Sequence, residues 1–279
     1  MTLAQARALS ITGTTRLLAV VGDPIAQVQA PSLVNPLLAE LGRDAVVVPV
    51  HARAAEFPTV LAGLRATVNL DGVLVTIPHK AAAASLADRR SPAVEITGAA
   101  NVLRREPDGA WRAENFDGVG FTRALARAGD TLPGARVSLV GGGGAGSAIA
   151  AALLDAGIAR LHIHDPDGPR LAALLARLEI RWPGRAAAAP APVTAGIEII
   201  VNATPLGLRP GDPLPFPVDD LPDGCAVADI IMKPPVTALL RAAAERGLPT
   251  RPGRPMLAEQ VELYREFFRL DDLPALDAS

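Results

Sequence analysis

Cysteine, aromatic residues and charge of either sign are all in short supply in this chain of 279 residues. Cys225 is the only cysteine, which excludes an intrachain disulfide and makes a reducing cytoplasm the expected compartment. Only 3% of the residues are aromatic while 49% are hydrophobic, so the core has to be built mainly from Ala, Val, Leu and Ile. The net charge of −2, with acids and bases interspersed, predicts neither a nucleic-acid partner nor a membrane surface.

Two kinds of active site find little support in the sequence. The four histidines are His51, His79, His162 and His164. No cluster of cysteines or carboxylates accompanies them, so we expect no metal site, and His79 is expected to have a structural role. There is no G-x-S-x-G motif and no obvious activating partner for Cys225, which argues against covalent catalysis. The first apolar run, 17–21, has the length of a strand and is too short for a signal core or a membrane span.

The strongest motif lies at 137–154. A short apolar run typical of a buried parallel strand is followed by Gly141, Gly143 and Gly146 in the spacing G-x-G-x-x-G. These glycines permit a tight turn, close approach of a diphosphate to backbone N–H groups, and close packing of helix on strand. A second strand pattern ends on Asp165, about 20 residues further on, where a carboxylate binds the adenosine ribose. The sequence therefore predicts a Rossmann dinucleotide-binding unit; a plain tight turn with a helix-capping aspartate is the alternative.

Strand and helix patterns alternate along the whole chain and predict two open α/β domains. In the first unit we expect parallel strands at 17–21, 45–50 and 72–77, helices at 31–41, 56–66 and 80–87, and a hairpin over 102–115. In the second we expect strands at 137–140, 161–164, 197–201 and 226–231, with helices between them and a surface loop at 185–192. A single amphipathic helix at 256–268 is expected to return to the first unit. The predicted substrate-binding domain thus comprises 1–117 and 253–279, and the predicted cofactor-binding domain comprises 118–252.

Polar residues that could carry chemistry follow the strand ends of the first unit. Lys80 comes just after a strand, where a lysine can exchange a proton with a substrate hydroxyl, although a solvated lysine at a helix start would look the same. Asp117 lies between the hairpin and the next helix, where it could cap the helix, pair with Lys80 across a cleft, or do both. Asn101 is a polar residue in a small, apolar segment, and a satisfied turn asparagine is its alternative.

Seven segments in order resemble the shikimate dehydrogenase family over nearly the whole chain. They are Gly22-Asp23-Pro24-Ile25, Val75-Thr76-Ile77-Pro78-His79-Lys80, Gly98-Ala99-Ala100-Asn101, Asn115-Phe116-Asp117-Gly118, the glycine loop, Asn202-Ala203-Thr204-Pro205, and Gly253 with Met256-Leu257 and Gln260. The resemblance implies a two-domain enzyme with a cleft between the domains. Such an enzyme transfers a hydride between nicotinamide and a ring carbon of a shikimate- or quinate-like cyclic hydroxy acid, and the protein orients the cofactor that carries the redox chemistry.

The resemblance also implies roles by position. Lys80 and Asp117 would be the acid–base pair, and Thr76, Asn101 and Gln260 would hold ring hydroxyls. The cofactor-binding residues would be Gly141, Gly143, Gly144, Ala145, Gly146, Asp165, Asn202, Ala203, Thr204, Pro205, Ile230, Gly253 and Met256.

Three departures from the family pattern bear on specificity. Val28 and Ala30 stand where the family has two serines that bind the substrate carboxylate, so we expect weak activity on shikimate itself. Leu74 replaces an asparagine and Met232 a tyrosine, which makes the substrate pocket less polar. The third departure is Asp165, where members that use the phosphorylated cofactor carry Asn-Arg-Thr around this position; a carboxylate there favours NAD over NADP.

We therefore expect an NAD-dependent dehydrogenase that acts on a small molecule as a monomer or homodimer. The alternative is a regulatory or sensory protein that binds the cofactor but has lost turnover. The presence of Lys80, Asp117, Asn101 and Gln260 together argues against that alternative.

Overall fold

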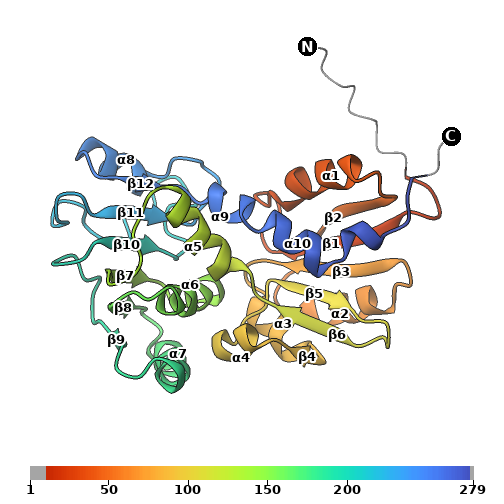
Figure 1. Ribbon diagram of the computed structural model, residues 1–279, viewed down its shortest axis with the longest axis horizontal. Helices are drawn as coiled ribbons and strands as arrows, with labels where there is room; N and C mark the ends of the chain where they lie inside the picture. The colour runs from red at the N-terminus through yellow and green to blue at the C-terminus, as the bar shows by residue number, and fades with distance from the viewer. Residues whose placement is uncertain (1–10, 277–279) are drawn as a thin grey trace, which may run out of the picture.

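Two α/β units, each built on a six-stranded sheet, make up the computed structural model, which describes residues 11–276 (Figure 1). The first unit contains β1 (Arg16–Gly22), α1 (Ala30–Glu40), β2 (Ala45–His51), α2 (Phe57–Ala66), β3 (Leu70–Val75), α3 (Lys80–Leu86), β4 (Arg89–Arg90), α4 (Pro92–Thr97), β5 (Val102–Arg105) and β6 (Trp111–Glu114). The predicted class of two open α/β domains is confirmed.

The first sheet has the strand order β2-β1-β3-β5-β6-β4. The strands β2, β1 and β3 are parallel, as predicted, but β5 runs antiparallel to both β3 and β6. The predicted hairpin is formed by β5 and β6, and it joins the sheet through its first strand. Successive residues of β1 point to opposite faces: Ala19 and Val21 pack with α2, whereas Leu18 and Val20 pack with α1 and the C-terminal helices.

The second unit contains α5 (Asp117–Arg127), β7 (Arg136–Val140), α6 (Gly144–Asp155), β8 (Arg160–His164), α7 (Gly168–Arg181), β9 (Ala186–Ala188), β10 (Ile199–Asn202), β11 (Ala226–Asp229), α8 (Ala238–Glu245) and β12 (Thr250–Arg251). Its strands are all parallel, in the order β12-β11-β10-β7-β8-β9, which is the order of a Rossmann fold. The sequence suggested a loop at 185–192, but β9 forms there as an edge strand, and its three alanines carry no strand-specific pattern.

The chain returns to the first unit through α9 (Arg254–Ala258), α10 (Val261–Phe267) and the 3-10 helix η1 (Leu270–Asp272). The predicted return is confirmed, since Tyr264, Phe268 and Leu270 belong to the core on one face of the first sheet. The predicted single helix is interrupted at Gln260, whose N–H bonds the carbonyl of Leu257 three residues back instead of four. None of the helices among residues 11–276 combines the length and apolar character needed to cross a membrane.

Helix α5 lies where the two units meet, and two of its glycines let other helices approach it closely (Figure 1). A Cβ added at Gly118 would lie 2.2 Å from the carbonyl oxygen of Ala148 in α6. A Cβ at Gly120 would lie 2.5 Å from the carbonyl oxygen of Met256 in α9 and 2.7 Å from Cγ of Gln260. Helix α5 therefore packs against both α6 and the returning C-terminal segment.

Arg177 of α7 makes a second contact between the units. Its guanidinium donates to the carbonyls of Ile96 (2.7 Å) and Thr97 (3.2 Å) at the C-terminal end of α4. A cation there satisfies carbonyls that have no partner within the helix and complements the helix dipole.

We expect Arg177→Met to lower the melting temperature by about 4–8 °C, because two charge-assisted hydrogen bonds contribute about 2 kcal/mol. Arg181→Met on the same helix is the matched control, since the Arg181 ion pair with Asp155 is more than half exposed and contributes little. Thermal unfolding of both variants checks this, and an equal shift in the two would contradict it.

Candidate active site

The glycine turn between β7 and α6 has the geometry that an anionic ligand requires. Gly141 has φ +102°, and a Cβ at Gly146 would lie 2.0 Å from the Gly141 carbonyl oxygen. Gly143 occupies the cap position of α6 without a side-chain hydrogen bond, and a Cβ built there meets nothing within 4 Å. The first N–H groups of the twelve-residue helix α6 are therefore available to a diphosphate.

Asp165 lies at the end of β8, directly beside this turn. One of its carboxylate oxygens accepts from the Gly142 N–H (2.6 Å), and the other accepts from the Asp167 N–H (2.8 Å). Arg170 of α7 bonds both oxygens with its guanidinium, through Nε at 3.2 Å and Nη2 at 2.6 Å. Burial by itself would raise the pKa of Asp165, but these hydrogen bonds and the Arg170 charge outweigh it and hold that pKa below its usual value. The carboxylate is thus ionised and fixed in direction.

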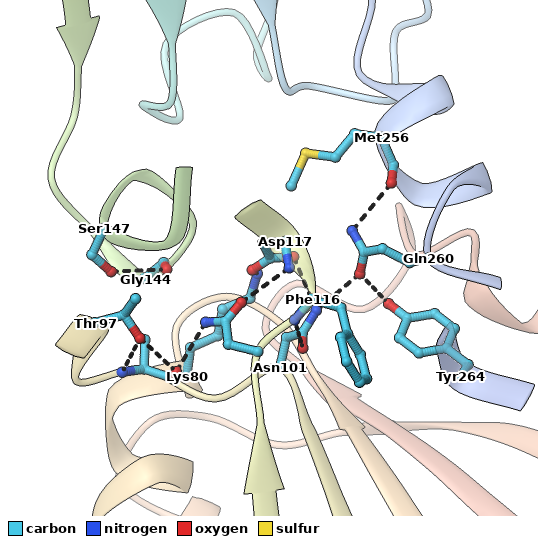
Figure 2. Close-up of polar contacts among 12 residues, drawn as sticks. Lys80, Thr97, Asn101, Phe116, Asp117, Gly144, Ser147, Met256, Gln260 and Tyr264 are labelled. Carbon is cyan, nitrogen blue, oxygen red and sulfur yellow. Dashed lines mark hydrogen bonds and ion pairs between the residues drawn. The ribbon is translucent and has the colours of Figure 1, made fainter. Parts of the chain in front are cut away.

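Lys80 and Asp117 form an ion pair at the junction of the two units (Figure 2). Lys80 is the first residue of α3 and Asp117 the first residue of α5, and their side chains are 13% and 7% exposed. Asp117 does not cap the helix, because Phe116 holds the cap position; its carboxylate points to Lys80 instead. The aliphatic part of Lys80 lies against the glycine turn: a Cβ added at Gly144 would be 2.9 Å from Lys80 Cβ. The structure therefore brings the predicted acid–base pair and the predicted phosphate cradle into contact.

A buried chain of hydrogen bonds extends from Asp117 toward the C-terminal helices (Figure 2). Asn101 donates through Nδ2 to Asp117 Oδ1 (3.1 Å) and to Gln260 Oε1 (2.9 Å), and its Oδ1 accepts from the Phe116 N–H (2.9 Å). Asn101 and Gln260 are 4% and 1% exposed, so these contacts are shielded from water. The structure thus joins Lys80, Asp117, Asn101 and Gln260 into one network, whereas a plain turn asparagine would be bonded within its own loop.

The loop after β10 is fixed by its own side chains. Asn202 is fully buried; it donates to Asp229 (3.2 Å) and to the Leu206 carbonyl (3.1 Å), and it accepts from the N–H and hydroxyl of Thr204. Burial raises the pKa of Asp229 above its usual value. The hydrogen bonds that Asp229 accepts from Thr237 and its neighbours lower the pKa by a smaller amount. The loop 202–205 packs on the glycine turn, because a Cβ added at Gly141 would lie 2.8 Å from the Ala203 carbonyl oxygen.

The remaining residues that were predicted to bind the cofactor lie just after β11 and at the start of α9. A Cβ added at Gly253 would lie 2.4 Å from the carbonyl oxygen of Ile230, so only glycine allows this approach of the two segments. Met256 follows in α9 and is 3% exposed. A cavity of about 130 Å³ beside Gly253 and Met256 is bounded by α5 and is not lined by Lys80 or Asp117. The site is therefore located by its charged and hydrogen-bonded residues and not by this cavity.

Four of the residues at which the chain departs from the family pattern share one apolar cluster. Ala30 and Leu74 are buried in it, and Val28 and Met232 pack against it half-buried. Phe116, the neighbour of Asp117, packs against the same cluster. Thr76, predicted to hold a ring hydroxyl, is half-buried directly after β3 and lies against Gly22. The polar network thus borders an apolar surface, the hydrophobic wall, which is formed by Val28, Ala30, Leu74 and Met232.

His79 and the other candidate ligands do not gather into a metal site. Within residues 11–276, no three His, Cys, Asp or Glu side chains come close enough together to hold a metal ion. The predicted structural role of His79 is confirmed: its ring is 1% exposed, stacks on Phe57 with centroids 4.3 Å apart, and bonds the carbonyl of Ala52 (2.8 Å).

Three residues near the site were not singled out from the sequence. Asn115 accepts from the Asp117 N–H (3.0 Å) and donates to the Ala99 carbonyl (2.9 Å), a role that the spacing Asn-x-Asp could have indicated. Arg170, five residues after Asp165, could have been noticed as a possible partner on the next helix. Tyr264, which donates to Gln260 Oε1, gave no signal beyond its place on the apolar face of a helix.

Comparisons with known proteins agree with this arrangement. A family model described as the shikimate dehydrogenase substrate binding domain matches residues 20–103. A shikimate dehydrogenase (NADP(+)) of Rubrobacter xylanophilus is 41% identical over 94% of this chain and 93% of its own length. A shikimate 5-dehydrogenase from Thermus thermophilus, solved with NADP(H) and shikimate, is 30% identical with a TM-score of 0.81, covering 94% of this chain and 96% of that one.

A third similar protein is named for a different reaction. The ligand-free 5-ketofructose reductase of a Gluconobacter strain has a TM-score of 0.78 and 27% identity, covering 92% of this chain and 94% of that chain. The predicted resemblance is confirmed by the first relative, whose identity extends over nearly the whole of both chains. This chain belongs to the shikimate dehydrogenase family.

Proposed function

We propose that the protein is an oxidoreductase that moves a hydride between a nicotinamide dinucleotide and a ring hydroxyl or ketone of a shikimate- or quinate-like cyclic hydroxy acid. One observation carries the proposal: Lys80, paired with Asp117, packs against Gly144 of the glycine turn. A proton-transfer group and a dinucleotide cradle thus lie side by side, as a dehydrogenase requires.

Residues of the chain transfer the hydroxyl proton of the substrate in this reaction. When bound, the nicotinamide supplies or accepts the hydride. In the oxidation of an alcohol, Lys80 Nζ takes up the hydroxyl proton as the C–H bond gives up its hydride, and a proton that Nζ carried before passes to solvent. In the reverse direction the ammonium donates that proton to the ketone oxygen. Asp117 stabilises the ammonium and holds Nζ in place, while Asn101 fixes the other oxygen of the Asp117 carboxylate.

The proposed roles of the other site residues follow from this arrangement. In our proposal Thr76, Asn101 and Gln260 serve the substrate, and the glycine turn, Asp165, loop 202–205, Ile230, Gly253 and Met256 serve the cofactor. The domain division is 1–117 with 253–279 for substrate and 118–252 for cofactor; residues 1–10 and 277–279 of the first domain lie outside the described structure.

NAD is the proposed preferred cofactor, although the curated relative and the Thermus structure are both named with NADP. The support is Asp165, an ionised carboxylate beside the Gly142 N–H. Its negative charge disfavours a 2′-phosphate in this place. Arg170 is the nearest counter-charge to it, and that guanidinium is already bonded to both carboxylate oxygens.

The hydrophobic wall formed by Val28, Ala30, Leu74 and Met232 bears on the substrate. A carboxylate against such a wall loses hydration without gaining hydrogen bonds, which costs several kcal/mol. A substrate whose end here is uncharged fits better, and the reductase of the Gluconobacter strain is named for a sugar without a carboxylate.

Shikimate is therefore expected to be a poor substrate of the wild type. The double variant V28S/A30S should raise kcat/KM for shikimate at least tenfold, because two hydroxyl donors return to the wall. A cyclitol without a carboxylate is the control substrate, and its kcat/KM should not rise in the double variant. Steady-state kinetics on both substrates checks this; efficient turnover of shikimate by the wild type at sub-millimolar KM would contradict it.

A panel of cyclic hydroxy acids and neutral cyclitols, scanned with NAD and NADP by the absorbance of the reduced nicotinamide, tests the function itself. Steady turnover of any member supports the proposal. Cofactor binding without turnover of any member would favour the regulatory alternative. That alternative is not favoured by the connected network of Lys80, Asp117, Asn101 and Gln260.

A further inference from the structure

Tyr264 ends the buried network on the side away from Lys80 (Figure 2). It lies one helical turn after Gln260, is 3% exposed, and donates its hydroxyl proton to Gln260 Oε1. Burial, together with the charge of Asp117, raises the pKa of Tyr264 well above its usual value, so the hydroxyl keeps its proton. The proposed reaction assigns this residue no task, although a buried hydroxyl aimed at a substrate-side amide is a specific arrangement.

The direction of every amide in the network follows from one backbone group. The Phe116 N–H can only donate, so the atom of Asn101 that faces it is the oxygen and Nδ2 faces the other way. Nδ2 can only donate, so the atom of Gln260 facing it is Oε1. Tyr264 then has to donate to that same oxygen. Phe116 and Tyr264 thus fix the chain of amides from its two ends.

Some N–H groups of the network have no hydrogen-bond partner within it. Both N–H groups of Asn101 are used, one by Asp117 and one by Gln260. Gln260 Oε1 accepts from two donors, and one N–H of its Nε2 is used by the Met256 carbonyl (3.3 Å). Among the contacts of the described residues, one N–H of Gln260 and two of Lys80 Nζ remain for a bound molecule.

We propose that Tyr264 is a positioning residue, which holds the Gln260 amide in the one orientation that presents its free N–H to the substrate. The inference rests on the proposed function and assigns Gln260 as a donor to substrate. Without the hydroxyl, Oε1 keeps a single donor, so the Gln260 amide can rotate for part of the time, while the Phe116 N–H still fixes the orientation of Asn101.

Tyr264→Phe is a clean test because the ring packing stays. The ring contacts Phe116 and Phe268 at centroid distances of 6.1 and 6.3 Å, and phenylalanine fills the same space. We expect kcat/KM for the best-used member of the panel of cyclic hydroxy acids and neutral cyclitols to fall about tenfold, with the KM for NAD unchanged. Phe268→Leu is the matched control: it disturbs the same aromatic cluster without touching Gln260, so it should lower the melting temperature but leave kcat/KM within twofold.

A double-mutant cycle separates positioning from a general loss of stability. In a Gln260→Leu background, Tyr264→Phe should reduce kcat/KM less than twofold further, because the residue through which it acts is gone. Equal losses in the two backgrounds, or wild-type kcat/KM in the single variant, would overturn the proposal.

A second readout needs no activity. In ¹⁵N-labelled protein the side-chain amide hydrogens of Gln260 should exchange with solvent at least tenfold faster in Tyr264→Phe than in the wild type. An unchanged exchange rate would overturn the positioning role. If no substrate is turned over by the wild type, the proposed function fails while this exchange measurement still decides the role of Tyr264.

Discussion

Lys80→Met is expected to lower kcat about 10³-fold and to leave the affinity for the dinucleotide within about threefold. General acid–base groups contribute about 10²–10⁴-fold, and in the proposed reaction Lys80 Nζ is the group that exchanges the substrate proton. The aliphatic part of Lys80 packs on Gly144, and methionine keeps most of that contact, so the glycine turn should still bind its ligand. Stopped-flow measurement of hydride transfer and a fluorescence titration of the cofactor check the two parts separately.

The stability of this variant needs its own control. Removing Lys80 leaves the Asp117 carboxylate buried at 7% exposure without its counter-charge, which destabilises the fold by up to about 3–5 kcal/mol. The double variant K80M/D117N removes that charge, so it should melt at a higher temperature than Lys80→Met and be equally inactive. Wild-type turnover in either variant would remove Lys80 from the mechanism.

Asp165→Ser is expected to shift the ratio of kcat/KM for NADP over NAD about 100-fold toward NADP. The substitution removes the charge that repels a 2′-phosphate, and it also frees the Arg170 guanidinium to bind that phosphate. Together, the lost repulsion and the gained charge-assisted bonds correspond to about 3 kcal/mol, which is about two orders of magnitude.

Asp167→Asn is the matched control for this shift. Asp167 also lies beside Arg170, at 3.2 Å, but its side chain is 45% exposed, and asparagine can still cap α7. Its cofactor ratio should change less than threefold. Steady-state kinetics with both cofactors checks the pair, and an unchanged ratio in Asp165→Ser would show that this carboxylate does not select the cofactor.

The lowered pKa of Asp165 sets the pH range over which the proposed preference for NAD should hold. Its folded value lies below the unfolded value, so its stabilising interactions are fully present above the unfolded pKa and are lost as the pH falls through the folded pKa. The carboxylate is thus charged throughout the neutral range, and the preference for NAD should not vary there through Asp165.

Those parts of the protein that depend on short stretches of sequence could be predicted without a structure. The glycine turn, the strand before it and the placement of Asp165 are all fixed by local spacing, and the structure has them where the motif predicted. The same holds for β1, whose apolar run matches a strand buried on both faces.

What could not be predicted depends on contacts between residues far apart in sequence. Gln260 accepts a hydrogen bond from Asn101, which lies 159 residues away in the sequence. Only the fold decides whether the oxygen or the nitrogen of each side-chain amide takes part in this contact. Arg177 reaches α4 across 80 residues, and nothing in the helical pattern of α7 distinguishes it from a solvated arginine. The edge strand β9 forms from three alanines because a neighbouring strand offers hydrogen bonds, a reason that lies outside its own residues.

The two glycines of α5 have a consequence for the reaction rate. Because Gly118 and Gly120 carry no side chain, the backbones of α6 and α9 approach α5 to within a distance that a methyl group would forbid. These helices bear the dinucleotide cradle on one side and the residues next to Gln260 on the other. In the proposed reaction, the separation between hydride donor and acceptor therefore depends on the side chains that α5, the helix that begins with Asp117, lacks at Gly118 and Gly120. A displacement of about 1 Å at such a centre can reduce a rate 10²-fold, so a single methyl group on α5 should slow turnover while every catalytic group remains present.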